Sequence, residues 1–219
     1  HPPFEARNGF VSIGNGKHAP NVEAVKILKH EIWPRIRKKL PDAEIHIYGA
    51  YLPQQVNEMH NPKTGFYIKG WAKNVETVLN NAKVLLAPIQ FGAGIKGKLL
   101  DAMHAETPSV TTSIGAEGMH GEQPWNGTIT DNWNDFAQAA MELYQEHEVW
   151  ENAKKQGIEL LRTFYDKATL QNQLLERVNQ LSKSLEAHRQ QNFIGKLLQH
   201  QTMASTEYMA KWIEEKNRG

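Results

Sequence analysis

Two glycine-rich segments hold the side chains best suited to bind an anion. The longer one runs from Pro88 to Lys98 and places three glycines, at positions 92, 94 and 97, beside Lys96 and Lys98 where a helical pattern begins. Cations at a helix N-terminus oppose the helix dipole, so two lysines there are easier to explain if an anion such as a diphosphate binds. Spacing alone favours an anion site over two solvated lysines.

The shorter segment runs from Gly14 to Asn21 and follows a short apolar stretch. Gly14 and Gly16 allow the backbone to come close to a ligand, and Lys17 and His18 carry groups that can face a phosphate. The alternative is a flexible connection in which both side chains are only solvated.

The same glycines also match the dinucleotide fingerprint G-x-G-x-x-G, with Glu117 at the distance expected of a ribose-binding acid. In dinucleotide-binding domains this fingerprint follows the first strand. Here three strand and helix units precede it, which argues against a dinucleotide site.

Alternating strands and helices must position both segments. Apolar runs predict strands at 9–14, 43–49, 66–70, 83–88 and 109–112, with an edge strand at 127–130, and helical periodicity separates most of them. Such alternation predicts a doubly wound, Rossmann-like parallel sheet of the α/β class. Because ligands bind beyond the carboxyl ends of such strands, both glycine-rich segments fall at the binding edge.

Composition excludes several kinds of protein. The 219 residues include 25 basic and 24 acidic side chains, so no global charge attracts nucleic acid. The absence of cysteine excludes disulfides and thiolate metal sites and favours a cytoplasmic setting. No apolar run approaches the roughly 20 residues of a membrane span.

The chain is expected to contain three parts. Residues 1–8 are proline-rich and are expected to be a linker that follows another part of the protein, 9–166 form the binding domain, and 167–219 form a helical extension. The tail from Gln190 is amphipathic, and it is expected either to complete the core of this domain or to dock on another domain or a partner.

The stretch from Phe91 to Met103, followed by 107–112 and 115–118, resembles the signature of family-4 (group 1) glycosyltransferases. Weaker resemblance extends over about residues 9–165. It implies that the chain is the donor-binding, C-terminal half of the two-domain architecture called GT-B.

The resemblance also implies a role for particular residues. Asp101 matches the acid that binds the nucleotide ribose, and Lys98, with Lys96, matches the basic residues that neutralise the donor diphosphate. Trp71 falls where the nucleotide base is contacted, although an aromatic side chain packed in a loop is an equal alternative. Gly14 and Lys17 are assigned to the diphosphate, and Gly92, Ala93 and Gly94 to the loop beside the donor sugar.

Three departures from the family pattern stand out. Ala93 replaces the first of two glutamates and aspartate replaces the second at Asp101, which leaves recognition of the sugar open. Asn15 and Pro20-Asn21 stand where Arg and Lys-Gly are common. No catalytic acid or base is identified, since Asp42, His60, His104 and His120 lie in no recognisable relay, and neither a metal nor a cofactor is expected.

The resemblance implies a glycosyltransferase that binds a UDP- or GDP-sugar and transfers the sugar with retention of configuration. An N-terminal domain would hold the acceptor, and this half alone is expected to be inactive. A sugar-nucleotide epimerase of the same architecture and a non-catalytic interaction module remain alternatives, and peripheral membrane association of the full enzyme stays open.

Overall fold

The computed structural model describes the backbone of residues 1–218 and the side chains of residues 1–198 and 205–218. The chain divides into two compact units, His1–Asp166 and Lys167–Gly219. Each unit is described by itself below.

The first unit is built on a six-stranded sheet in the order β3-β2-β1-β4-β5-β6, and every neighbouring pair is parallel. The strands are β1 (Phe10–Ile13), β2 (Ile45–Tyr48), β3 (Phe66–Gly70), β4 (Val84–Ala87), β5 (Ser109–Thr111) and β6 (Gly127–Ile129). All six predicted strands are present, which confirms the doubly wound α/β fold. The strand order reverses between β1 and β4, so their carboxyl ends form the topological switch point.

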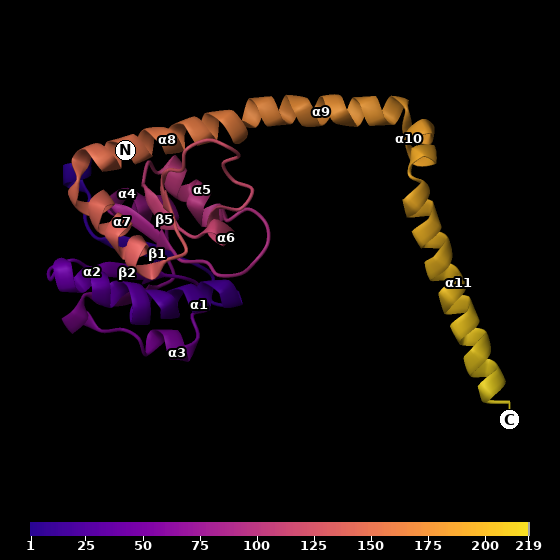
Figure 1. The fold of residues 1–219 in the computed structure, drawn as a ribbon, viewed down its shortest axis with the longest axis horizontal. Helices are drawn as coiled ribbons and strands as arrows, with labels where there is room; N and C mark the ends of the chain where they lie inside the picture. The colour runs from indigo at the N-terminus through magenta and orange to yellow at the C-terminus, as the bar shows by residue number, and fades with distance from the viewer. Residues whose placement is uncertain (219) are drawn as a thin grey trace. The chain divides into compact units, whose positions relative to one another are not determined.

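One face of the sheet is covered by α1 (Ala19–Ile27), α2 (Trp33–Lys39), the short α3 (Gln54–Asn57) and α7 (Trp133–Gln145) (Figure 1). Alternate strand residues such as Phe10, Ile45 and Phe66 point into this layer and are almost fully buried. Apolar residues at every second position of the strands and at helical spacing in α7 therefore pack into one core.

A π-helical turn, η2 (Leu28–Ile32), joins α1 to α2. Pro34 explains it, because proline has no N–H to donate and its ring clashes with the carbonyl four residues earlier. The helical segment between β1 and β2 is therefore continuous but widened over one turn.

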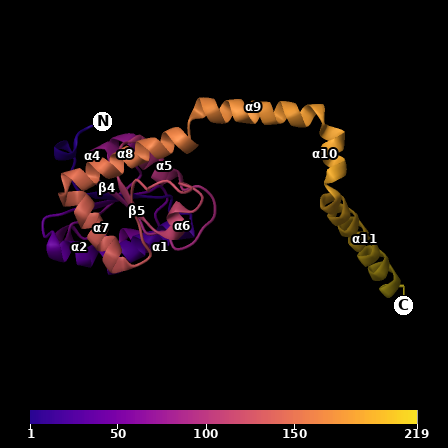
Figure 2. The same ribbon diagram turned by 45° about the horizontal axis from the view of Figure 1, so that its top comes forward.

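The opposite face is covered by α4 (Val75–Asn81), α5 (Gly97–His104) and α8 (His147–Phe164) (Figure 2). Val11, Leu85 and Ala87 point toward these helices and pack with Leu79 and Leu99. The short α6 (Ser113–Ala116) follows β5, and the 3-10 turn η3 (Pro62–Thr64) precedes β3.

The first eight residues, expected to be a linker, lie in the same compact unit as the sheet. Phe4, in the 3-10 turn η1 (Phe4–Ala6), is buried against Trp150 of α8. The buried Arg7 guanidinium donates to the carbonyl oxygens of Leu79, Ala82 and Ala105, at the C-terminal ends of α4 and α5. Thr107 Oγ1 also donates to the carbonyl oxygens of Leu79 and Ala105, so Arg7 and Thr107 together cap the C-terminal ends of two helices and fix this segment.

The second unit consists of α9 (Lys167–Lys183), α10 (Leu185–Gln191) and α11 (Phe193–Lys216). Among its described side chains none is buried. Within the described residues, the helices are too short or too polar to cross a membrane.

Candidate functional site

The two glycine-rich segments meet at the switch point of the sheet. They follow β1 and β4, which pair directly through Phe10 with Val84 and Val11 with Leu85. A Cβ atom on Gly92 would lie 3.3 Å from the ring of Pro20, so the loop after β4 lies directly against the start of α1. The two segments, which the sequence predicted separately, therefore lie side by side.

A hydrogen bond joins the two segments. Lys98, in the first turn of α5, donates from Nζ to Oδ1 of Asn21 in α1 over 2.6 Å. Nδ2 of Asn21 donates to the carbonyl oxygen of Asn15 at 2.9 Å, which ties the same side chain to the loop after β1. A Cβ atom on Gly14 would come within 2.6 Å of the Asn21 side chain, so this approach requires glycine there.

Asn21 was not among the predicted site residues. The resemblance placed it at a departure from the family pattern and gave it no role. Its position at the start of the helix after a glycine-rich loop is the signal that identifies it, because such positions face the ligand edge.

The helices α1 and α5 begin without a side-chain cap, although the N–H groups of Asn21 and Leu99 donate to the carbonyl oxygens of His18 and Lys96. Neither has a capping side chain or an acidic residue in its first turn. By contrast, α4 is capped by Asn74 and carries Glu76, and α7 is capped by Asn132 and carries Asp135. The helix ends that face the switch point therefore present positive partial charge that an anion can satisfy.

Lys98 is half-buried, and its burial lowers its pKa to about 8. A lysine without a carboxylate partner in such surroundings gains from a bound anion, which stabilises the ammonium form. Lys96 donates from Nζ to the carbonyl oxygen of Gly92 at 3.1 Å, within its own loop. Nζ of Lys17 lies 4.1 Å from the ring centroid of Tyr51, in a cation–π contact rather than beside Lys98.

Asp101 lies one turn beyond Lys98 on α5. It lines a hollow of about 410 Å³ that extends from Val75 and Glu76 at the start of α4 to Leu79, His104, Ala105 and His1, toward the C-terminal ends of α4 and α5. The residue is exposed, but its carboxyl group is partly buried, and this burial raises the pKa of Asp101. The nearby His104 offsets part of the rise. A carboxylate at the rim of an open hollow is placed to accept hydrogen bonds from two hydroxyl groups.

Trp71 follows β3 and is 70 % exposed, so its indole face is open to a planar ligand. It precedes α4, which packs against α5, the helix of Asp101. The alternative of a packed loop aromatic does not fit this exposure.

The loop assigned to the donor sugar is open. Gly92, Ala93 and Gly94 are all exposed, and Gly92 and Gly94 have φ angles of 119° and 79°, which favour glycine. A Cβ atom on Gly94 would meet no atom within 4 Å, so the backbone borders open space.

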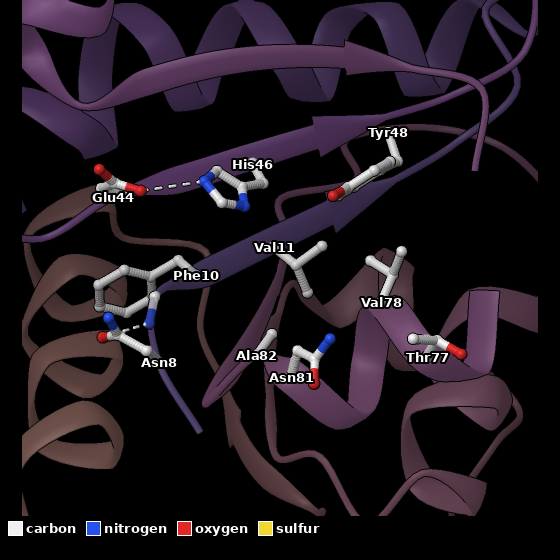
Figure 3. A pocket seen from close by; sticks show the side chains of 11 residues that line it. Asn8, Phe10, Val11, Glu44, His46, Tyr48, Thr77, Val78, Asn81 and Ala82 are labelled. Atoms are coloured by element: carbon white, nitrogen blue, oxygen red, sulfur yellow. Dashed lines mark hydrogen bonds and ion pairs between the residues drawn. The ribbon is translucent and has the colours of Figure 1, made fainter. Parts of the chain in front are cut away.

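Another hollow, of about 430 Å³, lies between the sheet face at β1 and β2 and the helix α4 (Figure 3). Its walls include Asn8 and Glu44, at the amino ends of the strands, and the hydrogen bond between His46 and Glu44 crosses its rim at 3.1 Å. Ligands of open α/β sheets bind at the opposite, carboxyl edge, so we do not assign the donor to this hollow.

The remaining histidines considered above have local partners. Nδ1 of His60 accepts from the backbone N–H of Ile68 at 3.0 Å, and Nδ1 of His120 lies 2.8 Å from the carbonyl oxygen of Gln123. Glu117 ends α6, not the strand after the glycine-rich loop, which argues further against dinucleotide binding. Within residues 1–198 and 205–218 no histidine and carboxylate cluster is arranged to hold a metal.

Comparison with solved structures finds the same fold in several glycosyltransferases. TarM from S. aureus, in complex with fondaparinux, α-GlcNAc-glycerol and UDP, is 18% identical, with 80% of this chain and 36% of TarM covered and a TM-score of 0.66. The pneumococcal O-GlcNAc transferase GtfA, in complex with UDP and GlcNAc, is 17% identical, with 81% and 37% covered and a TM-score of 0.62. The chain thus spans about a third of the length of these proteins.

A third similar structure is the C-terminal domain of the group 1 glycosyl transferase LpcC from Francisella tularensis. It is 15% identical, with 74% of this chain and 90% of that domain covered and a TM-score of 0.54. At these identities the likeness shows a shared fold, that of one half of a GT-B architecture. No curated protein matches significantly.

The family assignment comes from the sequence itself. The model of the family described as glycosyl transferases group 1 matches residues 7–146, which include both glycine-rich segments, Asn21 and Asp101. The resemblance seen in the sequence is confirmed, and the chain belongs to the group 1 glycosyl transferases.

Proposed function

We propose that the first unit binds a nucleoside diphosphate sugar at the switch point between β1 and β4. The observation that carries the proposal is the meeting of two helix ends without side-chain caps at the Lys98–Asn21 hydrogen bond. This arrangement supplies backbone N–H donors and one lysine to a diphosphate. TarM and GtfA were solved in complex with UDP, which makes a UDP-sugar the first donor to test and a GDP-sugar the second.

Each predicted residue has a place in this proposal. Lys98, with Lys96 and Gly14, faces the diphosphate, and Lys17 joins them once it leaves the ring of Tyr51. Asp101 accepts hydrogen bonds from the ribose hydroxyls. Trp71 stacks on the base. The loop of Gly92, Ala93 and Gly94 borders the donor sugar, and with alanine at position 93 its contacts come from the backbone.

The reaction proposed is glycosyl transfer with retention. The bond between the anomeric carbon and the diphosphate breaks, and its electrons pass to the diphosphate, whose charge Lys98 and the two helix ends stabilise. The new bond to the acceptor oxygen forms on the same face of the sugar, and the departing diphosphate takes the acceptor proton. An N-terminal domain is expected to hold the acceptor, so this chain alone binds the donor without transferring the sugar. A cytoplasmic location is proposed, consistent with the absence of cysteine.

A thermal-shift panel of UDP, GDP and their sugar conjugates tests the proposal. A ligand at 100 times its Kd stabilises the fold by about 2.7 kcal/mol. For a chain of this size that is a rise in Tm of roughly 5–10 °C. Lys98→Ala and Asp101→Ala should each reduce the shift, whereas Lys155→Ala and Asp42→Ala, which change exposed residues elsewhere, should preserve it.

The panel also separates the alternatives. No shift with any nucleotide would contradict donor binding and favour a non-catalytic module. If a nucleotide sugar binds, product analysis without an acceptor distinguishes an epimerase, which converts the sugar, from a transferase half, which leaves it unchanged.

A further inference from the structure

Tyr51 has an unusual backbone conformation at the carboxyl edge of the sheet. It follows β2 and has a φ angle of 57°, in the left-handed region that a bulky side chain rarely adopts. Glycine would adopt this conformation without strain. The Tyr51 side chain is 67% exposed, so burial of the ring does little to offset the strain. Backbone strain of this kind is concentrated at ligand-binding sites, which makes the ring a candidate for a role in binding.

The glycine-rich loop after β1 lies directly against the loop that carries Tyr51. The N–H of Gly16 donates to the carbonyl oxygen of Ala50 at 2.8 Å. A Cβ atom on Gly16 would collide with the carbonyl oxygen of Tyr51, so the approach of the two backbones requires glycine there. The close contact fixes the two loops relative to each other and brings Lys17, the next residue after Gly16, beside Tyr51.

Lys17 places its ammonium group over the ring of Tyr51. Nζ lies 4.1 Å from the ring centroid, within the range of a cation–π contact. The backbone N–H of Lys17 donates to Oδ1 of Asn15 at 2.9 Å, which fixes the backbone and leaves the exposed side chain to move about its own bonds. The carbonyl oxygen of Asn15 accepts from Asn21, the partner of Lys98. Lys17 therefore stands at the rim of the proposed diphosphate site but is turned toward Tyr51.

We propose that Tyr51 is a positioning residue that holds Lys17 away from the diphosphate site until a donor binds, an inference that rests on the proposed function. A diphosphate attracts an ammonium group more strongly than an aromatic ring does, because phosphate oxygens carry full charges and the ring offers only its quadrupole. The donor therefore draws Lys17 off the ring, and Lys17 then joins Lys98. A ligand without phosphate groups leaves Lys17 over Tyr51, so the movement depends on the charge of the ligand.

NMR of the lysine side chains in the isotope-labelled full chain tests where the ammonium group lies. Protons above the face of an aromatic ring resonate upfield, so the Hε protons of Lys17 should be shifted upfield in the ligand-free protein. Addition of UDP should move this resonance to the position of a solvated lysine, whereas uridine, which has no phosphate, should leave it unchanged. Lys17→Arg assigns the resonance, and Tyr51→Leu should remove the upfield shift.

The outcomes of this experiment separate the inference from the proposed function on which it rests. If calorimetry shows that UDP binds while the Lys17 resonance stays upfield, the positioning role is wrong and donor binding stands. A Lys17 resonance without an upfield shift in the ligand-free protein would also overturn the positioning role. If UDP does not bind at all, both the inference and the proposed function fail.

The affinity for UDP tests the energetic role of the ring. Tyr51→Leu keeps an apolar side chain but removes the ring, whereas Tyr51→Phe keeps the ring and removes only the hydroxyl group. Because Lys17 no longer has to leave the ring, Tyr51→Leu should bind UDP about two- to fivefold more tightly, the ratio that corresponds to a cation–π contact at an exposed site. Tyr51→Phe should bind UDP as the unchanged chain does.

Lys17→Met provides the background in which the ring holds no ammonium group. Lys17→Met alone should weaken UDP binding, and Tyr51→Leu added to it should cause no further change in affinity. A gain from Tyr51→Leu that persists beside Lys17→Met would show that the ring does not act through Lys17. Weaker binding by Tyr51→Leu in the otherwise unchanged chain would show that the ring supports the donor directly, and either result would overturn the inference.

Discussion

Lys98 and Asn21 are 77 positions apart in the sequence, yet Nζ of Lys98 lies 2.6 Å from Oδ1 of Asn21. The contact exists because β1 and β4 are neighbours at the point where the strand order reverses. Each residue stands near the start of the helix that follows its strand. A single amide side chain therefore sets the position of the lysine assigned to the donor diphosphate.

Replacement of Asn21 tests this positioning role. Asn21→Leu removes the acceptor and should weaken nucleotide-sugar binding about tenfold, which corresponds to about 1.4 kcal/mol. Asn21→Asp should weaken binding more, because its carboxylate attracts the ammonium but repels the diphosphate. Isothermal titration calorimetry measures both, with the exposed Asn81→Leu as control. If Asn21→Asp bound the nucleotide sugar as well as the unchanged chain does, no phosphate group would lie at this position.

The pH dependence of stability should reveal Lys98. Its folded-state pKa of about 8 lies below the ordinary lysine value of 10.5 because of burial. Below pH 8 the Lys98 side chain is charged in both the folded and the unfolded chain, so the cost of burying the charged ammonium lowers the stability of the fold in full. From about pH 8 upward the unfolded chain holds a proton that the folded chain has lost, so the contribution of Lys98 to stability rises with pH.

Comparison with Lys98→Met isolates that contribution. The Tm of the variant relative to the unchanged chain should be highest below pH 8 and should decrease toward pH 10. Lys155→Met, an exposed lysine, should show no such trend. A difference for Lys98→Met that is independent of pH would mean that the lysine keeps an ordinary pKa.

Donor binding should respond to pH in the opposite direction. A nucleotide sugar keeps its phosphodiester charges over this range, and its binding favours the ammonium form of Lys98. Above pH 8 affinity should therefore fall, by up to about tenfold for each pH unit. Fluorescence or calorimetric titration from pH 7 to 9.5 measures the fall, and Lys98→Met should abolish it. If the affinity of both proteins fell equally with pH, the proton linked to binding would belong to a group other than Lys98.

Arg7 is expected to be essential for stability. Its guanidinium also donates to Oγ1 of Thr107 at 2.8 Å and to the carbonyl oxygen of Pro2 at 2.9 Å, and it is 2% exposed. Arg7→Met removes the guanidinium from the buried C-terminal carbonyls of α4 and α5, of which those of Leu79 and Ala105 keep Thr107 Oγ1 as a donor, and should cost about 3 kcal/mol. Thermal unfolding should show a fall in Tm of roughly 6–12 °C. The exposed Arg162→Met is the control, and a fall no larger than the control's would show that water replaces the guanidinium.

The sheet could be predicted from the sequence because its signals are local. Short runs with glycine or proline at one end mark each strand, and the helices between most of them require parallel pairing. The packing of residues 1–8 could not be predicted, since Arg7 acts on helix ends more than 70 residues away. Proline content at the start of the chain indicates a linker only when no tertiary contact overrides it.

The sequence predicted the two loops of the candidate site but not how the fold brings them together. Glycine spacing and the position of Lys98 identified each loop, whereas the role of Asn21 depends on strand order. Sequence also placed Lys17 beside the diphosphate, while the structure places its ammonium over Tyr51, and a ligand has to draw it away from that ring. Side-chain direction in a loop depends on neighbours that the sequence pattern does not specify.

Gly157 offers a test in which helix propensity and packing make opposite predictions. It lies in α8, where alanine would ordinarily stabilise the helix by about 1 kcal/mol. A Cβ atom there would lie 2.8 Å from Cβ of Asn126, which is 1% exposed and bonds to Ser109 at 2.7 Å and to the carbonyl oxygen of Thr107 at 3.1 Å. Because the contact is with a buried and fully bonded side chain, α8 has to move outward.

Gly157→Ala should therefore lower stability by about 1–3 kcal/mol despite the better propensity of alanine. Urea unfolding measures the change. The double variant Gly157→Ala with Asn126→Gly provides the control, because it removes the Cβ atom that the new methyl group meets and should lose less than the sum of the two single changes. Additive losses, or a single variant more stable than the unchanged chain, would show that α8 does not approach β6 as closely as the 2.8 Å contact requires.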